Sequence, residues 1–471
     1  MHARRFRFEY LPIAAALVVI GMTRLPFLAN GYGLDPDAWR VANAARLISQ
    51  TGTYAASRLP GYPVQEITCS FFWQWGPIAL NGLTALMSVL AVLFLMLILR
   101  HYGARLTDAI LAGFALAFTP LFFLNSLCSM DYVWAVALIL VAWYVAVRQM
   151  PLLAGVLLGI ATGCRITSLA MILPLAILLV NVKNFKLSAQ RCGWLSVGAV
   201  VGTALCFWPV WGRYGMGFWS HAVPKYYPSR DDLYASFTVW TFGILWKVIV
   251  LTVAIGIAFN IRRRRQVFIR FWQPLAAALC GILLEATIFL KLPSETSYLL
   301  PVTALAVLLV SFLPRPAALF VFLVLIVSPF DKQVAGFLHR PLSARERGSP
   351  SIWEDRQNRM EAFDDIKGML SFRQQSGKYV VVAGWYLPQV ETMAGGNPST
   401  VMVKYIYLLD EKNLDKYIHD GYTVIVPVVV NRFNIMVLGV NLFEINSRRK
   451  ITILKCKTCG KSDFKIIKPD V

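Results

Sequence analysis

Acidic residues are rare in the first 330 residues of this chain. Only ten of its 25 Asp and Glu residues lie there, among apolar runs that approach 20 residues in length. Runs of this length are about enough to cross a bilayer as helices, which excludes a soluble globular protein and predicts a polytopic α-helical membrane protein. Because ionisable groups are costly near hydrocarbon, the few carboxylates that remain are candidates for function.

The excess of basic residues indicates a topology. The formal net charge is +21, and in the first 330 residues Lys and Arg collect in short gaps that alternate with gaps holding the acids. This is the positive-inside pattern of an inner or plasma membrane protein, so nucleic-acid binding is not indicated. Counting spans under this constraint predicts about eleven transmembrane helices, a cytoplasmic N-terminus and an external tail. The predicted spans are 11–29, 73–99, 106–124, 132–148, 151–164, 166–182, 194–211, 237–260, 273–290, 297–313 and 316–330.

Residues 331–471 have a different composition. They carry 21 Lys or Arg and 15 Asp or Glu, and no run long enough to span a membrane. Runs rich in β-branched and aromatic residues predict three strands, and two further segments predict helices. The strands are predicted at 379–382, 401–408 and 422–430, and the helices at 349–373 and 414–419. We therefore expect a transmembrane domain over 1–330 and a small extracytoplasmic α/β domain over 331–471.

Cysteine is scarce as well, and most of it is scattered. Six of the eight Cys lie in or beside predicted spans, and Cys456 and Cys459 form a lone CxxC in the tail. A zinc site would need a second pair or histidines at matching spacing, and the tail offers only His339 and His419. A local disulfide is the favoured interpretation for an external tail.

Two of the scarce acids stand two residues apart, in Asp35-Pro36-Asp37, just after the first predicted span. An Asp at the start of a helix is a good N-cap, which accounts for one of them and not for both. A carboxylate at a water–lipid boundary can act as the general base towards an acceptor hydroxyl. The alternative is a divalent cation held by the pair, and the base is the favoured interpretation.

A stiff loop, Ser57 to Pro63, follows the acidic pair. Its two prolines bracket a glycine, an arrangement that can hold Arg58 in a fixed place. A guanidinium is well matched to phosphate, so Arg58 is a candidate phosphate ligand, and a plain turn is the alternative. Glu66, shortly after the loop, is a further outward-facing acid and a site candidate.

Asp131 and Arg165 lie at the outer ends of later spans. Asp131 is either a second acid facing the same cavity or the N-cap of the fourth span. Arg165 lies at the tip of a predicted short hairpin, where it either snorkels to the interface or reaches the site and binds phosphate.

Two more outer segments supply candidates. The loop 212–236 contains Lys225 and Arg230 among aromatic residues that we expect to be interfacial anchors. A later segment places Lys291, Glu295 and Tyr298 at the outer end of two adjacent spans. Acids and bases are thus predicted to meet at one membrane face, which suits an enzyme that binds an anionic lipid headgroup and deprotonates a hydroxyl.

Four of these elements, in this order, resemble those of the GT-C class of integral-membrane glycosyltransferases. The similarity is to the branch containing the protein mannosyltransferases and the lipid A aminoarabinose transferase, and it covers roughly residues 1–330. The elements are the acidic pair (Asp35, Asp37), Arg-x-Pro-Gly-Tyr-Pro (Arg58 to Pro63), Gly-x-Arg-x-x-Ser (Gly163 to Ser168) and Glu-x-x-Tyr-Leu-Leu-Pro (Glu295 to Pro301).

The resemblance implies a polyprenyl-phosphate-linked sugar donor, a lipid, glycan or protein acceptor, and inverting transfer on the outer face. By position, Asp35 or Asp37 inherits the role of the base, and Arg58, Arg165 and Lys291 are candidate ligands of the donor phosphate. The better-known relatives usually carry an Asp-Glu pair where this chain has Asp-Pro-Asp. The choice of base and the use of a metal therefore stay open.

Two other functions compete with sugar transfer. One is transport or flipping of an anionic or lipid-linked solute, and the other is polysaccharide ligation or polymerisation from a lipid-linked donor. Transporters often show internal repeats and ionisable residues near mid-membrane. This chain shows no convincing repeat, and most of its acids are predicted at one face, so glycosyl transfer is the leading hypothesis.

Overall fold

The computed structural model describes residues 2–219, 227–259, 261–293, 295–337, 351–370, 377–394, 402–406, 416–417, 419–428, 451–455 and 463–467. The chain folds into two compact units. The helical unit comprises Met1–Ala29 and Ala44–Asp355, and the sheet unit comprises Asn30–Asn43 and Arg356–Val471. The predicted division at residue 330 counted residues 30–43 with the membrane part, whereas in the structure they fold with the tail.

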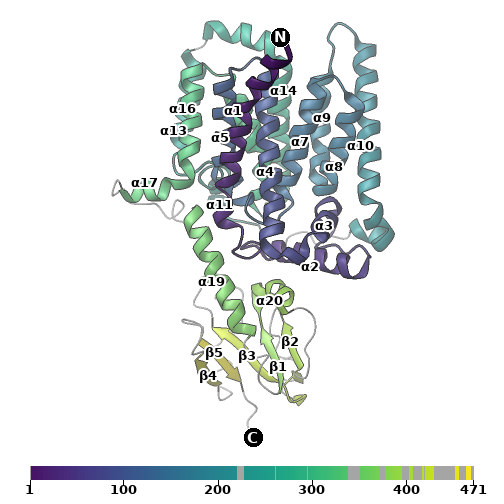
Figure 1. Cartoon of the computed structure of the whole chain (residues 1–471), viewed down its shortest axis with the longest axis vertical. Helices are drawn as coiled ribbons and strands as arrows, with labels where there is room; N and C mark the ends of the chain where they lie inside the picture. The colour runs from purple at the N-terminus through teal and green to yellow at the C-terminus, as the bar shows by residue number, and fades with distance from the viewer. Residues whose placement is uncertain are drawn as a thin grey trace. The chain divides into compact units, whose positions relative to one another are not determined.

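The helical unit is a bundle of helices (Figure 1). Many of them begin with proline at the first or second position, where its missing N–H costs nothing and its fixed φ suits a helix. Its α-helices are α1 (His2–Met22), α3 (Pro63–Ser70), α4 (Gly76–His101), α5 (Leu106–Phe118), α6 (Pro120–Asn125), α7 (Tyr132–Val147), α8 (Pro151–Cys164), α9 (Ile172–Leu179), α10 (Phe185–Tyr214), α11 (Arg230–Phe237), α12 (Val239–Phe242), α13 (Trp246–Phe259), α14 (Ile261–Lys291), α15 (Leu300–Val310), α16 (Arg315–Val327) and α17 (Asp331–Phe337).

Short 3-10 turns join several of these helices, and two long helices connect the units. The turns are η1 (Leu25–Phe27), η2 (Trp73–Trp75), η3 (Ile166–Met171), η4 (Gly215–Trp219), η5 (Thr296–Leu299) and η6 (Ser328–Phe330). Helices α2 (Pro36–Thr51) and α19 (Ile352–Leu370) each cross a boundary between the units along the chain. The acid-bearing start of α2 therefore belongs to the sheet unit, and its second half to the helical unit.

Each of the eleven predicted spans falls on mainly helical backbone. Among the described residues, four helices are long and apolar enough to cross a membrane, and a bent pair (79°) would be a fifth. The four are Tyr10–Phe27, Trp73–His101, Phe185–Gly217 and Ile269–Lys291, and the bent pair is Arg230–Phe242 with Trp246–Ala258. The remaining apolar helices are shorter, so the count of eleven spans stays a prediction.

Glycines allow a close approach between α8 and α10 in the helical unit. A Cβ built on Gly159 would lie 2.6 Å from the backbone of Gly202, and one built on Gly163 would lie 2.6 Å from Cβ of Cys206. Small residues let helix backbones approach in this way, with close packing over their length. The contact fixes the end of α8, and the residue that follows this end is Arg165.

The sheet unit contains a five-stranded sheet of order β2-β1-β3-β5-β4. β1 pairs in parallel with β2 and β3, whereas β5 runs antiparallel to both β3 and β4. The strands are β1 (Lys378–Val382), β2 (Met402–Ile406), β3 (Thr423–Val428), β4 (Ile451–Lys455) and β5 (Asp463–Ile467), with η8 (Gly384–Tyr386) and α20 (Leu387–Ala394) after β1. β1, β2 and β3 overlap the three predicted strand runs, and α19 overlaps the predicted helix at 349–373. The CxxC of Cys456 and Cys459 lies outside the described residues.

Candidate functional site

A buried carboxylate closes the stiff loop that carries Arg58. Glu66 of α3 is fully buried and accepts hydrogen bonds from the backbone N–H of Ser57 (2.6 Å) and of Tyr62 (2.9 Å), and from the hydroxyl of Tyr54. Burial raises the pKa of the Glu66 carboxyl above its usual value, and the hydrogen bonds from Ser57 and Tyr54 oppose this rise. Because both ends of the loop bind one side chain, Arg58 is carried on a fixed backbone.

Two arginines share one carboxylate at the centre of the site. Arg58 Nη2 lies 2.7 Å from Asp131 Oδ1, and Arg165 Nη1 lies 2.5 Å from Asp131 Oδ2. The Asp131 side chain is fully buried, and the two arginine side chains are 16% and 8% exposed. Asp131 occupies the N-cap position of α7, but its side chain makes no capping hydrogen bond there. The Asp131 side chain therefore does not cap α7, and its ion pairs are with the two arginines.

Arg165 reaches Asp131 because the chain changes conformation at the end of α8. This residue is extended (φ −156°, ψ 118°) between the last turn of α8 and η3, as expected for the tip of a tight hairpin. Its Nε is buried and has no hydrogen-bond partner among the described residues. A buried donor without a partner is costly, and an acceptor supplied by a ligand would satisfy it.

Aromatic rings cover both guanidinium groups. The Arg165 Cζ lies 3.8 Å from the ring centroid of Tyr132 and 4.0 Å from that of Tyr298, and the Arg58 Cζ lies 4.1 Å from that of Tyr62. Cations are attracted to ring faces at these distances, most strongly where water is excluded. The Tyr132 hydroxyl also donates a hydrogen bond to the carboxylate of Glu295.

Sequence reasoning named Tyr298 and Glu295 and missed the two other tyrosines of this group. Their positions in the sequence could have identified both, because Tyr132 follows Asp131 directly and Tyr62 lies inside the Arg-x-Pro-Gly-Tyr-Pro element. We refer to Arg58, Asp131 and Arg165, with Tyr62, Tyr132, Tyr298 and Glu295, as the arginine cluster.

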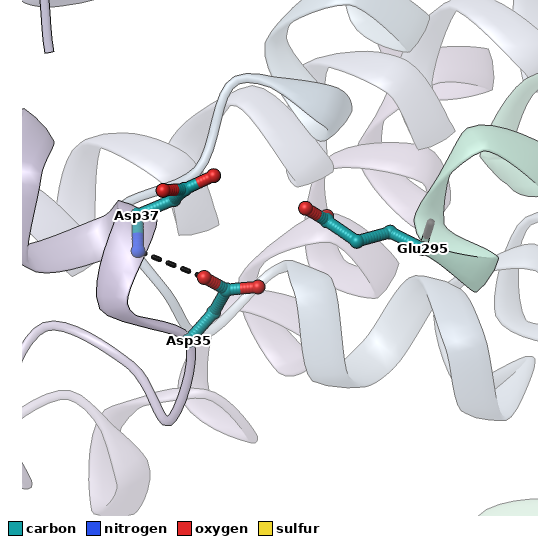
Figure 2. A group of neighbouring side chains, drawn as sticks. All are labelled: Asp35, Asp37 and Glu295. Atoms are coloured by element: carbon teal, nitrogen blue, oxygen red, sulfur yellow. Dashed lines mark hydrogen bonds between the residues drawn. The ribbon is translucent and has the colours of Figure 1, made fainter. Parts of the chain in front are cut away.

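The predicted acidic pair lies at the start of α2, in the sheet unit (Figure 2). Asp35 Oδ1 accepts a hydrogen bond from the backbone N–H of Asp37 (2.8 Å), so Asp35 is the N-cap of α2. Asp37 Oδ1 accepts one from Arg40 Nη1 (2.8 Å) one helical turn further on. Capping thus accounts for one acid and an ion pair for the other.

The remaining predicted basic residues are Lys291, Arg230 and Lys225. Lys291 is the last residue of α14 and Arg230 the first of α11; both are exposed, and within the described part of the chain neither forms an ion pair. Lys225 lies outside the described residues.

No family model and no curated protein matches the chain. Solved structures do match along almost its whole length. The structure of ArnT from Cupriavidus metallidurans bound to undecaprenyl phosphate matches with a TM-score of 0.60 and 12% identity, over 97% of this chain and 98% of that one. The apo structure of the same ArnT matches with a TM-score of 0.57 and 14% identity, over 99% and 98%. The chain has the fold of ArnT.

The ArnT likeness confirms, for the fold, the resemblance to GT-C enzymes predicted from the four ordered motifs. It also extends that resemblance beyond residues 1–330, because the match covers nearly the whole chain. At 12–14% identity, this likeness concerns the fold.

Proposed function

We propose that this protein transfers a sugar from a polyprenyl-phosphate-linked donor to an acceptor hydroxyl, with inversion at the anomeric carbon. The observation that carries the proposal is the arginine cluster, in which Arg58 and Arg165 converge on one buried carboxylate. One of the two ArnT structures with the same fold is bound to undecaprenyl phosphate, the product that such a reaction would release.

The arginine cluster suits a lipid phosphate for a chemical reason. Asp131 uses one nitrogen of each guanidinium in the two ion pairs, and Arg165 Nε is left buried without a partner among the described residues. Phosphate oxygens accept from guanidinium N–H groups in a planar, charge-assisted geometry. Asp131 would orient both guanidinium groups, and the leaving phosphate would gain negative charge where they can stabilise it.

The acidic pair supplies the base in this mechanism. Asp35 or Asp37 takes the proton of the acceptor hydroxyl. As the proton leaves, the hydroxyl oxygen attacks the anomeric carbon on the face opposite the phosphate. The bond between that carbon and the phosphate oxygen breaks, its electron pair stays on the oxygen, and polyprenyl phosphate leaves. Lys291, Lys225 and Arg230 would serve as further cations towards the lipid headgroup, and Glu66 as the residue that holds the Arg58 loop.

The same proposal includes a placement in the membrane. About eleven spans would put the N-terminus in the cytoplasm and the C-terminal α/β domain outside, with membrane lipids around residues 1–330. The acceptor is a lipid, glycan or protein that carries a free hydroxyl.

Binding of undecaprenyl phosphate to the purified protein in detergent tests the phosphate site without knowledge of the sugar. Arg165→Lys keeps the charge but loses the planar fork, so we expect Kd to rise about tenfold or more, since a hydrogen bond to a charged group contributes about 1.5–3 kcal/mol. The matched control is Arg315→Lys, because Arg315 pairs with Asp108 on an exposed surface (3.1 Å) of the same unit. Equal affinities for the two variants would contradict the assignment.

Turnover is measured as release of polyprenyl phosphate from radiolabelled lipid-phosphate sugars. Asp35→Asn keeps an N-cap acceptor and Asp37→Asn keeps the side-chain shape, so we expect one of the two variants to lose activity while both stay folded. Full activity in both would exclude the base assignment. Activity that disappears in EDTA and returns with a divalent cation would favour the cation role of the pair, and passage of an intact donor across the membrane would favour a transporter.

A further inference from the structure

The segment that bears the two acids is built into the hydrophobic core of the sheet unit. Trp39 follows Asp37 by two residues on α2 and is only 3% exposed. It belongs to a cluster of buried residues that come from α19, β1, η8, α20 and the link between β1 and η8: Ala362, Ile366, Val381, Ala383, Tyr386 and Val390. An indole of this size dominates the apolar surface that such a small core buries.

Aromatic contacts and hydrogen bonds fix the indole from several sides. The Trp39 ring lies 6.3 Å from that of Phe363 in a stacked arrangement and 5.0 Å from that of Tyr32 edge-on. Its Nε1–H donates to the backbone oxygen of Gly33 (2.8 Å), and Thr392 Oγ1 donates to the backbone oxygen of Trp39 (3.3 Å). Phe363 of α19 therefore contacts the Trp39 side chain, and Thr392 of α20 binds the Trp39 backbone.

The chain before Trp39 is fitted to the same ring. Gly31 has a left-handed backbone (φ +68°), and a Cβ added to it would lie 2.8 Å from Trp39 Cζ2. Only glycine combines that conformation with so close an approach. The loop from Gly31 to Gly33 thus folds around the indole, and Asp35 leaves this loop to cap α2.

A charge links the acidic pair to α20 as well. Arg40, the partner of Asp37, also acts on the carboxylate of Glu391 on α20. Burial raises the pKa of the Glu391 carboxyl and the positive charge of Arg40 opposes the rise. The first turn of α2 is therefore tied to the tail by apolar packing, by a hydrogen bond from the Thr392 side chain to the Trp39 backbone, and by charge.

We propose that Trp39 is a positioning residue through which the C-terminal part of the chain sets the place of the Asp35–Asp37 pair. This inference rests on the proposed function, in which one of the two carboxylates is the base. The tail then acts on the reaction without supplying a group that touches the substrate. A general base must lie within hydrogen-bond reach of the proton it takes, and a misplacement of about 1 Å can lower the rate about a hundredfold.

Amide hydrogen exchange of the full-length protein tests whether Trp39 holds the acid-bearing segment in place, and it needs no activity assay. In Trp39→Ala we expect the amides of residues 33–43 to lose protection by about tenfold more than those of β1. The matched control is Ile366→Ala, which removes a fully buried side chain from the same core but lies on α19, outside the acid segment. It is expected to lower protection of both regions alike. Unchanged protection of residues 33–43 in Trp39→Ala would overturn the proposal.

A second pair of variants perturbs the ring without removing it. Gly31→Ala and Gly52→Ala place the same side chain on nearly the same left-handed backbone (φ +68° and +66°), but nothing lies within 4 Å of a Cβ on Gly52. We expect only Gly31→Ala to reproduce the local loss of protection. Equal behaviour of the two glycine variants would show that backbone strain, and not displacement of Trp39, is responsible, and would overturn the proposal.

Kinetics separate positioning from stability. Trp39→Ala should lower kcat about a hundredfold with a threefold or smaller change in the KM of the donor, Trp39→Phe should restore most of kcat, and Ile366→Ala should keep kcat within about threefold. An equal loss of kcat in Ile366→Ala at the same thermal midpoint would overturn the proposal. If Asp35→Asn and Asp37→Asn are both fully active while the exchange result holds, neither aspartate is the base, but Trp39 still holds residues 33–43 in place.

Discussion

The arginine cluster and the acidic pair are held by different physical means. In the helical unit, Arg165 is buried and Arg58 is half-buried. Both depend on one shared counter-ion, Asp131, and on tyrosine rings over their faces. In the sheet unit, Asp35 and Asp37 keep ordinary helix-start interactions, and an apolar neighbour, Trp39, supplies the fixed point.

This difference determines how each region tolerates change. Removing one member of a buried ion pair leaves an uncompensated charge, whereas removing a cap or an exposed ion pair at a helix start costs little. The charges of the arginine cluster are therefore inseparable from the stability of the unit. The charges of the acidic pair can be altered with the fold intact, which makes them the better place to separate chemistry from structure.

The largest expected effect comes from Asp131→Asn, which leaves two nearby guanidinium groups without their shared counter-charge. We expect the variant to be destabilised by about 3–5 kcal/mol, because breaking a buried pair strands the partner charges. Thermal unfolding of the purified protein in detergent measures the loss.

The control for Asp131→Asn is Asp108→Asn, which breaks the ion pair with the half-exposed Arg315. Exposed pairs contribute about 0–1 kcal/mol, so this variant should unfold close to the unsubstituted protein. Equal midpoints for the two variants would mean that the arginine cluster is not held by Asp131.

An intermediate effect is expected from Gly159→Ala, which tests whether helix packing places Arg165. The added Cβ would lie 2.6 Å from the backbone of Gly202, and backbone cannot move aside as a side chain can. Overpacking of this kind costs about 1–3 kcal/mol, so a lower unfolding midpoint and weaker binding of undecaprenyl phosphate should appear together. Gly193→Ala on α10 is the control, since nothing lies within 4 Å of its Cβ. A stable Gly159→Ala with normal binding would show that the close approach of α8 to α10 does not set the arginine.

The helical part of the fold could be predicted from the sequence, because long apolar runs separated by basic gaps indicate membrane-spanning helices. The turn at Arg165 was also readable, since two short runs met there with basic flanks. The pairing of Arg58 and Arg165 with Asp131 could not be predicted from the sequence. The two arginines lie 73 and 34 positions from Asp131, and only tertiary packing brings them to its carboxylate. Charge type identified the participants, but their pairing depends on contacts that no local pattern encodes.

The place of residues 30–43 was missed for a related reason. Next to an apolar run, Trp39 reads as an interfacial aromatic, a common feature of membrane proteins. Its partners Phe363 and Val381 lie more than 300 positions away, so its role in the sheet unit's core has no sequence signature of its own. Gly31 is similar: its left-handed backbone and its contact with the indole appear only once the loop has folded.

The smallest expected effect concerns Asp35, where structure and charge can be separated. Asp35→Ala removes the oxygen that accepts from the Asp37 N–H, and the loss of an N-cap costs about 1 kcal/mol, so the first turn of α2 should exchange its amides faster. Asp35→Asn keeps an acceptor of the same reach and should leave that exchange nearly unchanged. If Asp35→Asn frays α2 as much as Asp35→Ala does, the negative charge itself holds the turn, through the positive end of the helix dipole. The charge of Asp35 would then be structural, as the charges of the arginine cluster are. If Asn preserves the turn and abolishes sugar transfer, the charge serves the chemistry, and Asp35 rather than Asp37 is the base.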